Sequence, residues 1–167
     1  SPSRGLGDVY KRQKIYCDIV SELEAGKNVA MLTIGDPSVY STYMYIHKRV
    51  IQAGFTAVMI SGVPSFCAAA ARLGISLGEM MDEIHIIPAS YDVRDTVGYG
   101  GTCVYMKSGK KLAELIEVLR TGDAIRKKKM TVYGVTNCGM ESERVYRGLD
   151  ELTEAKGYLT IVIVKYS

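Results

Sequence analysis

The residues best suited to do chemistry form a turn, Gly35-Asp36-Pro37-Ser38, which directly follows the apolar run 29–34. Glycine has no side chain, so a ligand can approach the main chain closely there. Pro37 presets φ for a first helical turn, and Asp36 or Ser38 can accept hydrogen bonds from free helix N–H groups. Open α/β sheets bind ligands where a strand ends in such a turn, so this is a candidate site. An ordinary strand-to-helix connection is the alternative.

Side chains that commonly carry acid–base, nucleophilic or metal chemistry form no cluster in the sequence. Asp36, Ser65 and His85 are a triad on paper, but nothing in their spacing supports one. The two histidines, His47 and His85, are too few and too separated for a zinc site, so we expect no metal. Four cysteines without a C-x-x-C pair are typical of buried thiols in a reducing cytoplasm.

Short apolar runs alternate with helical patterns in the first half of the chain. Three runs predict parallel strands buried on both faces: 29–34, 56–60 and 83–88. Three helical patterns accompany them: from Lys14 to a stop at Gly26, from about Pro37 to Gly54, and from Phe66 to Gly74. This alternation predicts a parallel α/β layer.

The second half predicts a different sheet. Leu112, Leu115, Ile116 and Leu119 recur at helical spacing, which predicts a helix over 110–120 that ends at Gly122. Strands are expected at 102–106, 130–135 and 158–166, and 143–149 reads as a strand or a short helix. No helical pattern follows the last strand, so we expect a mixed or antiparallel sheet.

The predicted domain organisation has three parts. Residues 1–13 mix turn formers with charges and lack apolar periodicity, so we interpret them as a leader outside the fold. The polar segment 90–101 predicts a domain boundary. We therefore expect an N-terminal α/β domain over 14–89 and a C-terminal α/β domain over 90–167.

The composition excludes several classes of partner. The chain is 47% apolar and 23% charged, as globular proteins are, and its net charge of +3 only slightly favours an acidic ligand. No apolar stretch approaches the roughly 20 residues of a membrane span. The basic run 126–129 precedes a predicted strand and is more typical of a solvated loop than of a nucleic-acid site. We expect neither membrane nor nucleic acid as a partner.

Several segments together resemble one family. From about Ile15 to the last residue, the chain resembles the tetrapyrrole methylases, which use S-adenosylmethionine (SAM) to methylate corrin and sirohaem precursors. The segments that carry this resemblance, in order, are TIGDPSVYSTYMYI, SGVPSFCAAAARLGISL, IHIIPAS, VYMKSGKKL, VTNCGMESERVY and YLTIVIVKYS. Within the family they are most similar to the precorrin-2 and cobalt-precorrin-2 C20-methyltransferases, and YSTYMYI and NCGMESE favour that subgroup.

The resemblance implies a fold, a cofactor and a reaction. The implied fold is the two-domain tetrapyrrole methylase fold, with a parallel α/β first domain, a mixed-sheet α/β second domain and SAM in the cleft between them, usually in a homodimer. Complete members carry an upstream strand and a glycine- and proline-rich loop that are not found here, so the first domain is expected to be incomplete. The implied substrate is precorrin-2 or its cobalt complex, methylated at carbon 20 on the route to cobalamin. A sister methylase acting on another ring position or on uroporphyrinogen, or an inert fragment, are the alternatives.

The family's cofactor contacts carry over by motif. The methionine part of SAM is expected at Ile34, Gly35, Asp36 and Val39. Pro64 and Ser65 match a second cofactor-binding turn of the family, in which Ser61 replaces the usual proline. The adenosine is expected beside Met106, and the adenine at Asn137, Cys138, Tyr158, Leu159 and Thr160. No catalytic residue is assigned. Lys107, Lys110 and Lys111 either attract substrate carboxylates or form a solvated helix start.

This resemblance agrees with the lack of acid–base residues. SAM carries an activated methyl group, so the protein mainly has to align donor and acceptor and exclude water. Such positioning supplies on the order of 7–11 kcal/mol in favourable cases. Glycine turns and main-chain donors serve that purpose.

Overall fold

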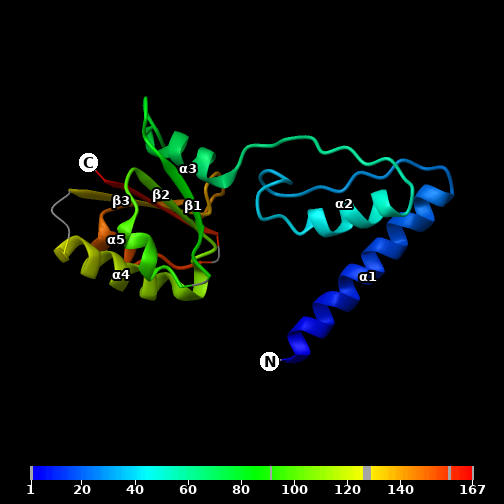
Figure 1. Cartoon of the computed structure of the whole chain (residues 1–167), viewed down its shortest axis with the longest axis horizontal. Helices are drawn as coiled ribbons and strands as arrows, with labels where there is room; N and C mark the ends of the chain where they lie inside the picture. Colours follow the sequence, from blue (N-terminus) through cyan, green and yellow to red (C-terminus); the bar gives the residue numbers. More distant parts are fainter. Residues whose placement is uncertain (1, 91, 126–128, 158, 167) are drawn as a thin grey trace. The chain divides into compact units, whose positions relative to one another are not determined.

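The computed structural model describes residues 2–90, 92–125, 129–157 and 159–166 (Figure 1). Contacts within the chain divide it into two compact units, Ser1–Pro64 and Ser65–Ser167, which are described separately. Helix α3 (Ser65–Leu73) belongs to the second unit because it packs on strand β5 (Thr160–Tyr166). The predicted domains 14–89 and 90–167 are a different division of the chain and stay a prediction.

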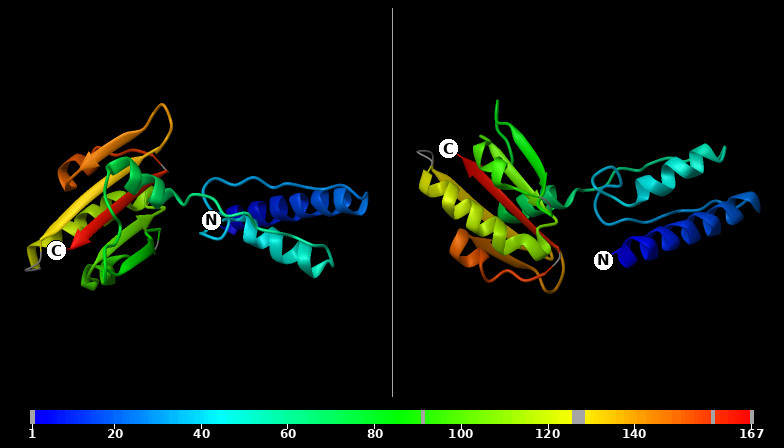
Figure 2. Two further views of the ribbon diagram at one scale, coloured as in Figure 1. Left: turned by 90° about the horizontal axis from the view of Figure 1, so that it is seen from above. Right: turned by 60° about the horizontal axis from the view of Figure 1, so that its bottom comes forward.

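The described residues of the first unit, from Pro2 on, form two helices and two segments without regular structure (Figures 1 and 2). Helix α1 spans Pro2–Glu24, so our prediction that the helical pattern begins only at Lys14 is wrong. Helix α2 spans Tyr43–Gln52 and starts later than Pro37, because a turn in which the Val39 N–H donates to the Asp36 carbonyl intervenes.

The predicted strands 29–34 and 56–60 are absent from the described structure of this unit. Both segments run as uncoiled traces in Figures 1 and 2, and no strand lies hydrogen-bonded beside either of them among the described residues. A strand needs a partner ladder as well as apolar residues, because its backbone groups bond to a neighbour. The parallel sheet expected for the first half is therefore not formed among the residues of this unit that the structure describes.

Helices α1 and α2 pack against each other. On α2, Ile46 and Val50 are buried at the helical spacing that the sequence predicts. Arg49 of α2 places its guanidinium 3.7 Å from the Tyr16 ring centroid and donates to the Gln13 side-chain oxygen at 2.7 Å, so it joins the two helices.

The second unit is built on a five-stranded mixed sheet with the order β1-β2-β5-β3-β4. Strand β1 (Ile84–Pro88) is parallel to β2 (Thr102–Met106), and the remaining pairs are antiparallel: β2 with β5, β5 with β3 (Met130–Thr136), and β3 with β4 (Arg144–Arg147). The expected mixed sheet is confirmed. Strand β1 was assigned to the first parallel layer, which is wrong, because its ladder is formed with β2.

Among the described residues of the second unit, α3 and a 3-10 turn η1 (Arg94–Gly98) are joined by three further helical segments. The predicted helix 110–120 starts as a 3-10 turn, η2 (Gly109–Lys111), and continues as α4 (Leu112–Ile125), passing through Gly122, where we expected it to end. The short helix α5 (Leu149–Leu152) follows β4, which settles the 143–149 alternative in favour of a strand. Among the described residues, no helix has the length and apolar character needed to cross a bilayer.

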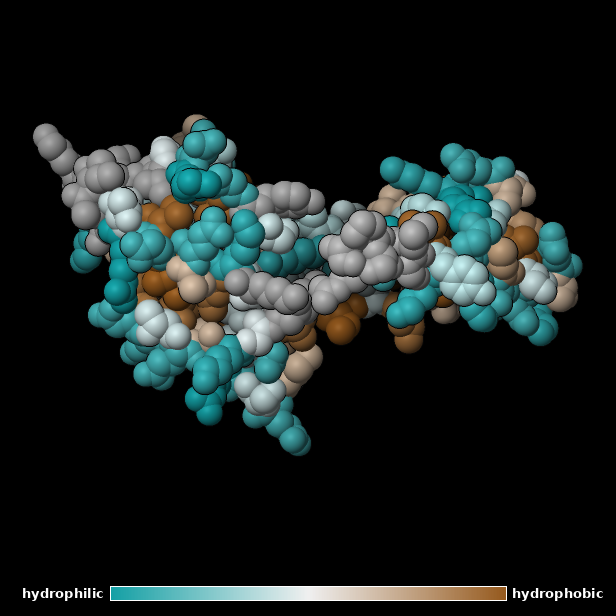
Figure 3. All heavy atoms as spheres, turned by 90° about the horizontal axis from the view of Figure 1, so that it is seen from below, coloured by the Kyte–Doolittle hydropathy of each residue, from teal (hydrophilic) through white to brown (hydrophobic). Residues whose placement is uncertain are grey.

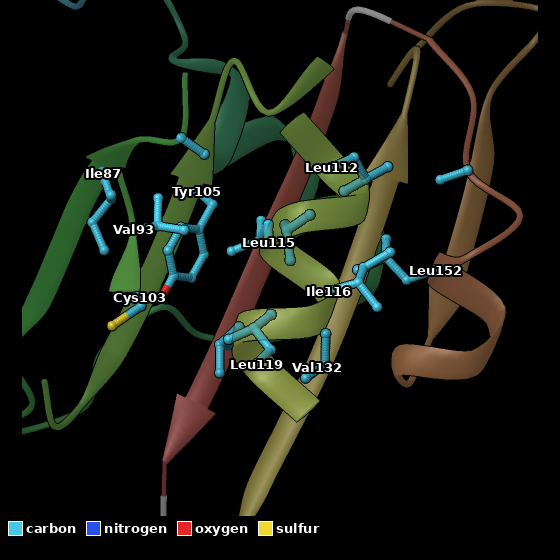
Figure 4. Close-up of a cluster of buried hydrophobic side chains, with 14 of the residues drawn as sticks. Ile87, Val93, Cys103, Tyr105, Leu112, Leu115, Ile116, Leu119, Val132 and Leu152 are labelled. Atoms are coloured by element: carbon cyan, nitrogen blue, oxygen red, sulfur yellow. The ribbon is translucent and has the colours of Figure 1, made fainter. Parts of the chain in front are cut away.

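The core of the second unit lies between α4 and the sheet (Figure 4). The four predicted positions of α4, Leu112, Leu115, Ile116 and Leu119, are all buried, so this periodicity is confirmed. They pack with a buried cluster from the strands that includes Cys103, Tyr105, Val132, Val162 and Val164. Burial of this apolar surface is the main stabilising contribution to the unit.

A buried tyrosine on β2 supplies a first prediction. The Tyr105 hydroxyl is 2.8 Å from the Thr96 hydroxyl, which donates to the Val93 carbonyl at 2.5 Å, and burial raises the pKa of Tyr105. Tyr105→Phe removes the hydrogen bond between the two hydroxyls, but Thr96 keeps its bond to the Val93 carbonyl. We expect a loss of about 1 kcal/mol in the free energy of unfolding, measured by urea denaturation. Thr96→Val removes this bond together with the one that Thr96 donates to the Val93 carbonyl, so it is expected to cost more, and the opposite order contradicts this prediction.

Candidate functional site

The glycine turn of the first unit is held together by one carboxylate. Gly35 has φ of 80°, in the region that favours glycine. The Asp36 side chain accepts the Ser38 N–H at 2.8 Å, the Ser38 hydroxyl at 2.5 Å and the Gly62 N–H at 2.9 Å. These three bonds lower the pKa of Asp36, the Ser38 hydroxyl contributing most. Asp36 thus joins the turn after 29–34 to the turn after 56–60.

Gly62 is a site residue that the sequence reasoning missed. A Cβ atom at this position would lie 2.2 Å from the Gly35 carbonyl oxygen, which is too close for any side chain. The two turns therefore approach each other through bare main chain. Its position could have indicated this role, because Gly62 follows a predicted strand and precedes Pro64 by two residues, as a glycine in a strand-to-helix turn does.

The predicted residues of the first unit gather around these joined turns. Ile34 is exposed directly before Gly35, and Val39 is half-buried directly after the Asp36 turn. Pro64, also half-buried, follows Gly62. The structure therefore brings Ile34, Gly35, Asp36, Val39 and Pro64 to one place, whereas Ser65 begins α3 in the second unit.

The predicted residues of the second unit that the structure describes, Ser65 of α3 excepted, lie at one edge of its sheet. Met106 ends β2, Thr136 ends β3, and Thr160 begins the antiparallel β5 beside them. The Asn137 N–H donates to the Leu159 carbonyl at 3.0 Å, which links the two loops at this edge. Asn137 has φ of 51°, which asparagine tolerates better than most residues. Tyr158, the remaining predicted residue here, lies outside the described residues.

Hydrogen bonds of hydroxyl groups connect the strands and loops at this edge of the sheet. The Thr136 and Thr160 hydroxyls are 3.0 Å apart, and the Thr160 hydroxyl also donates to the Gly157 carbonyl at 3.0 Å. The Ser108 hydroxyl donates to the Thr160 carbonyl at 3.5 Å. Ser108 and Thr136 were not among our predicted site residues. Polar side chains directly after strands were the signal that pointed to them.

A cleft of about 620 Å³ opens beside the same edge. Its lining combines amide, hydroxyl and charged side chains: Thr136, Asn137, Ser142, Arg144, Tyr146, Glu154 and Lys156. Among the predicted residues that the structure describes, Asn137 lines it, while the Met106 side chain is buried. The cleft therefore offers polar recognition groups and two cationic side chains.

The half-buried thiol of Cys138 lies next to a charged pair. Glu143 accepts the Gly139 N–H at 2.7 Å and a hydrogen bond from the Arg72 guanidinium, which together lower the pKa of Glu143. Burial raises the pKa of Cys138, the Glu143 carboxylate raises it further, and Arg72 opposes that rise. The thiol is therefore held in its neutral form.

This charge arrangement predicts opposite effects of two substitutions in a Cys17→Ser, Cys67→Ser background. Glu143→Gln is expected to lower the pKa of Cys138, because it removes a neighbouring negative charge. Arg72→Gln is expected to raise it, because it removes the compensating cation. The pH profile of the Cys138 reaction with iodoacetamide measures both shifts. Profiles that move in the same direction for the two variants contradict this account.

Two further predictions concern the lysines after β2 and the absence of a metal site. Lys107 is exposed at φ of 57° after β2, and Lys111 pairs with Glu114 at 3.3 Å, as a solvated helix start does. The Lys110 side chain lies outside what the structure describes. Within the described ranges, no three His, Cys, Asp or Glu side chains gather as a metal ion requires.

Comparison with known proteins connects this architecture to one family. The model of the family described as "Tetrapyrrole (Corrin/Porphyrin) Methylases" matches residues 5–153. A protein of Methanocaldococcus jannaschii named "Probable cobalt-precorrin-2 C(20)-methyltransferase" is 32% identical over 146 residues, which are 86% of this chain and 61% of that protein. The chain thus spans less than two thirds of this relative.

Two solved structures share the fold. A cobalt precorrin-4 methyltransferase has a TM-score of 0.78 at 16% identity, covering 92% of this chain and 70% of its own. A uroporphyrin-III C-methyl transferase from Thermus thermophilus, solved as a complex with S-adenyl homocysteine, has a TM-score of 0.72 at 17% identity, covering 93% and 73%. These similarities confirm the predicted fold class.

Proposed function

This chain belongs to the tetrapyrrole (corrin/porphyrin) methylases, and on that premise we propose that it is part of a SAM-dependent C-methyltransferase of cobalamin biosynthesis. The methyl acceptor we propose is carbon 20 of precorrin-2 or cobalt-precorrin-2. The name of the Methanocaldococcus relative supports this position. The similarity of the chain's NCGMESE and YSTYMYI segments to the C20 subgroup supports it as well.

The observation that carries the proposal is the pair of bare turns at Gly35 and Gly62. Their approach leaves no room for a Cβ at Gly62, and the φ of Gly35 turns the main chain sharply after the apolar segment. Such an exposed main chain fits the amino-acid part of SAM, whose amino and carboxylate groups hydrogen-bond to C=O and N–H groups. We propose that Ile34, Gly35, Val39 and Pro64 hold that part.

Asp36 has a different proposed role. Its carboxylate already accepts three hydrogen bonds from Ser38 and Gly62. We therefore propose that Asp36 fixes the two turns relative to each other and acts as a positioning residue. In this role the Asp36 carboxylate would lie near the positively charged sulfonium of SAM and would take no part in the reaction.

The remaining predicted residues are proposed to contact the rest of the cofactor. We propose that Met106 lies beside the adenosine and that Ser65 contacts the cofactor from the same turn as Pro64. The adenine is assigned to Asn137, Cys138, Tyr158, Leu159 and Thr160. The Asn137–Leu159 hydrogen bond and the Thr136–Thr160 contact support a preformed edge there. Preformed main-chain groups reduce the entropy that binding costs.

The chemistry follows from these roles. SAM supplies an electrophilic methyl group on a sulfonium, and a reduced tetrapyrrole supplies an electron-rich carbon. The residues of this chain then bind the donor, orient it and exclude water. Alignment of this kind accounts for rate enhancement without an acid–base side chain. We also propose a homodimer and a cytoplasmic location.

The test is methyl transfer from methyl-¹³C-labelled SAM. Precorrin-2, cobalt-precorrin-2 and uroporphyrinogen III are each incubated with the chain, and the labelled carbon of the product is assigned by NMR. Label at carbon 20 of one of the first two substrates supports the proposal. Label at another ring carbon identifies a sister methylase, and no transfer despite binding of S-adenosylhomocysteine identifies an inert fragment.

A further inference from the structure

The cleft of the second unit beside Asn137 contains side chains that the proposed cofactor contacts do not use. Arg144 and Tyr146 are two residues apart on β4, so their side chains lie on the same face of the sheet. Arg144 stands opposite Thr136 on β3, and Tyr146 stands opposite Gly134. A Cβ at Gly134 would lie 3.4 Å from an atom of the Tyr146 ring, so the ring packs close to the β3 backbone. Strand pairing therefore fixes a cation and a phenol on one side of the cleft.

The segment that follows α5 forms another part of the cleft wall. Ala155 is buried in the core cluster, and the exposed residues on either side of it, Glu154 and Lys156, both line the cleft. The next residue, Gly157, accepts a hydrogen bond from the Thr160 hydroxyl at 3.0 Å, which holds the segment against the sheet. Lys156 and the β4 residues thus line one cleft from separate segments of the chain.

Several hydrogen-bond donors of this cleft lack partners among the described residues. Neither Arg144 nor Lys156 has an ion pair there, and the Tyr146 hydroxyl has no hydrogen bond. Tyr146 is only 6% exposed, and burying a hydroxyl without a hydrogen bond costs free energy. The Ser142 hydroxyl accepts from the Asn137 side-chain amide at 3.0 Å, so its own proton can still be donated to a ligand.

This set of donors indicates the chemical class of the ligand. Figure 3 shows hydrophilic side chains over much of one face of the second unit, so a polar lining alone does not mark a site. The distinguishing feature is the buried phenol of Tyr146, whose hydroxyl lacks a partner beside two unpaired cations. Such donors fit a negatively charged acceptor, and a carboxylate can take two parallel hydrogen bonds from an arginine. The one carboxylate in the lining, Glu154, leaves an excess of positive charge.

We propose that this cleft binds a carboxylate side chain of the tetrapyrrole substrate. Arg144 pairs with the carboxylate oxygens, Lys156 adds a second positive charge, and the Tyr146 and Ser142 hydroxyls donate hydrogen bonds. Precorrin-2 and its cobalt complex both carry acetate and propionate side chains, which are carboxylates on flexible arms. Asn137 belongs both to this cleft and to the edge assigned to the adenine, so the arm is held beside the cofactor.

This inference rests on the proposed function and deepens it, because it names the residues that recognise the substrate. Most of the lining comes from the segment VTNCGMESERVY, which resembles the C20 subgroup. Carboxylate recognition in this cleft is then one source of substrate selectivity within the family.

The experiment measures the binding of uroporphyrin III, a stable tetrapyrrole with acetate and propionate side chains, by fluorescence titration of the full chain. Arg144→Gln and Lys156→Gln are each expected to weaken this binding about 10-fold, because each removes a charge-assisted hydrogen bond. Tyr146→Phe keeps the ring in the core and is expected to weaken it as well. Arg147→Gln is the matched control, because Arg147 is exposed on the same strand but faces the other side of the sheet. This variant is expected to bind as the parent does.

Three results would overturn the assignment. The first is equal loss of affinity in the Arg144 and Arg147 variants, which identifies an effect of net charge. The second is displacement of uroporphyrin III by equimolar inorganic phosphate, which identifies a site for small free anions. The third is an equal loss of S-adenosylhomocysteine affinity in the Arg144 variant, which assigns the cleft to the cofactor. Binding of uroporphyrin III that depends on Arg144, without methyl transfer to carbon 20, contradicts the proposed function and supports the carboxylate site.

Discussion

Gly62→Ala is expected to weaken the binding of S-adenosylhomocysteine by about 100-fold. The new Cβ would lie 2.2 Å from the Gly35 carbonyl oxygen, and a main-chain atom cannot move aside as a flexible side-chain end can. The turns must therefore separate, and the Gly62 N–H leaves the Asp36 carboxylate. A displacement of about 1 Å in a positioned site is enough for a change of this size. Isothermal titration calorimetry measures the affinity.

Gly100→Ala is the matched control, because a Cβ at this glycine meets no atom within 4 Å and its φ lies outside the region that favours glycine. This variant is expected to bind as the parent does. Amide exchange in α2 of the Gly62 variant shows whether the helices of the unit remain folded. Affinity equal to that of the parent, with α2 protected, contradicts the placement of the site.

Leu115→Ala is expected to lower the stability of the second unit by about 2–5 kcal/mol. Leu115 is fully buried on α4, within the cluster that joins this helix to the sheet. Truncation removes buried methyl groups and leaves a cavity, because close-packed neighbours relax only in part. Native-state exchange of the β3 and β5 amides measures the free energy of opening for this unit alone.

Glu117→Ala, on the exposed side of the same helix, provides the comparison and is expected to change stability by no more than about 0.5 kcal/mol. The helix-forming tendency of alanine is high, so the substitution itself does not disturb α4. Equal losses for the two variants contradict the assignment of the core.

The elements that could be predicted from the sequence were those whose partners lie in the chain. The spacing of Leu112, Leu115, Ile116 and Leu119 predicted α4 because the sheet that buries them is present. Strands β2, β3 and β5 were predicted for the same reason: each has a ladder partner. The predicted α/β fold class of the chain is confirmed by the comparisons.

The strand predictions were wrong where the outcome depends on a pairing partner as well as on the residues of the segment. The runs 29–34 and 56–60 have the composition of buried strands but find no ladder partner among the described residues. Strand β1 has a similar composition, and its partner β2 decided the sheet to which it belongs. Composition indicates that a segment can be a strand, but pairing determines whether and where it becomes one.

The sequence indicated the glycine turn of the candidate site but not the second turn that contacts it. Gly35 and Asp36 were predicted from their residue types, from their position after an apolar run and from the resemblance of this segment to the family. Gly62 was missed because its importance depends on a close approach to Gly35, which lies far from it in sequence. The delayed start of α2 has a similar cause, since Asp36 is engaged by Ser38 and Gly62 instead of capping the helix.

The most direct measurement for the central proposal is a titration of the ¹⁵N-labelled chain with S-adenosylhomocysteine, followed by the amide chemical shifts of individual residues. The account predicts that the amides of Gly35, Asp36, Val39 and Gly62 shift together and saturate in the micromolar range. Asp36→Asn, which weakens the acceptor that joins the two turns, is expected to reduce these shifts. Amide shifts confined to other residues, or none at saturating ligand, contradict it.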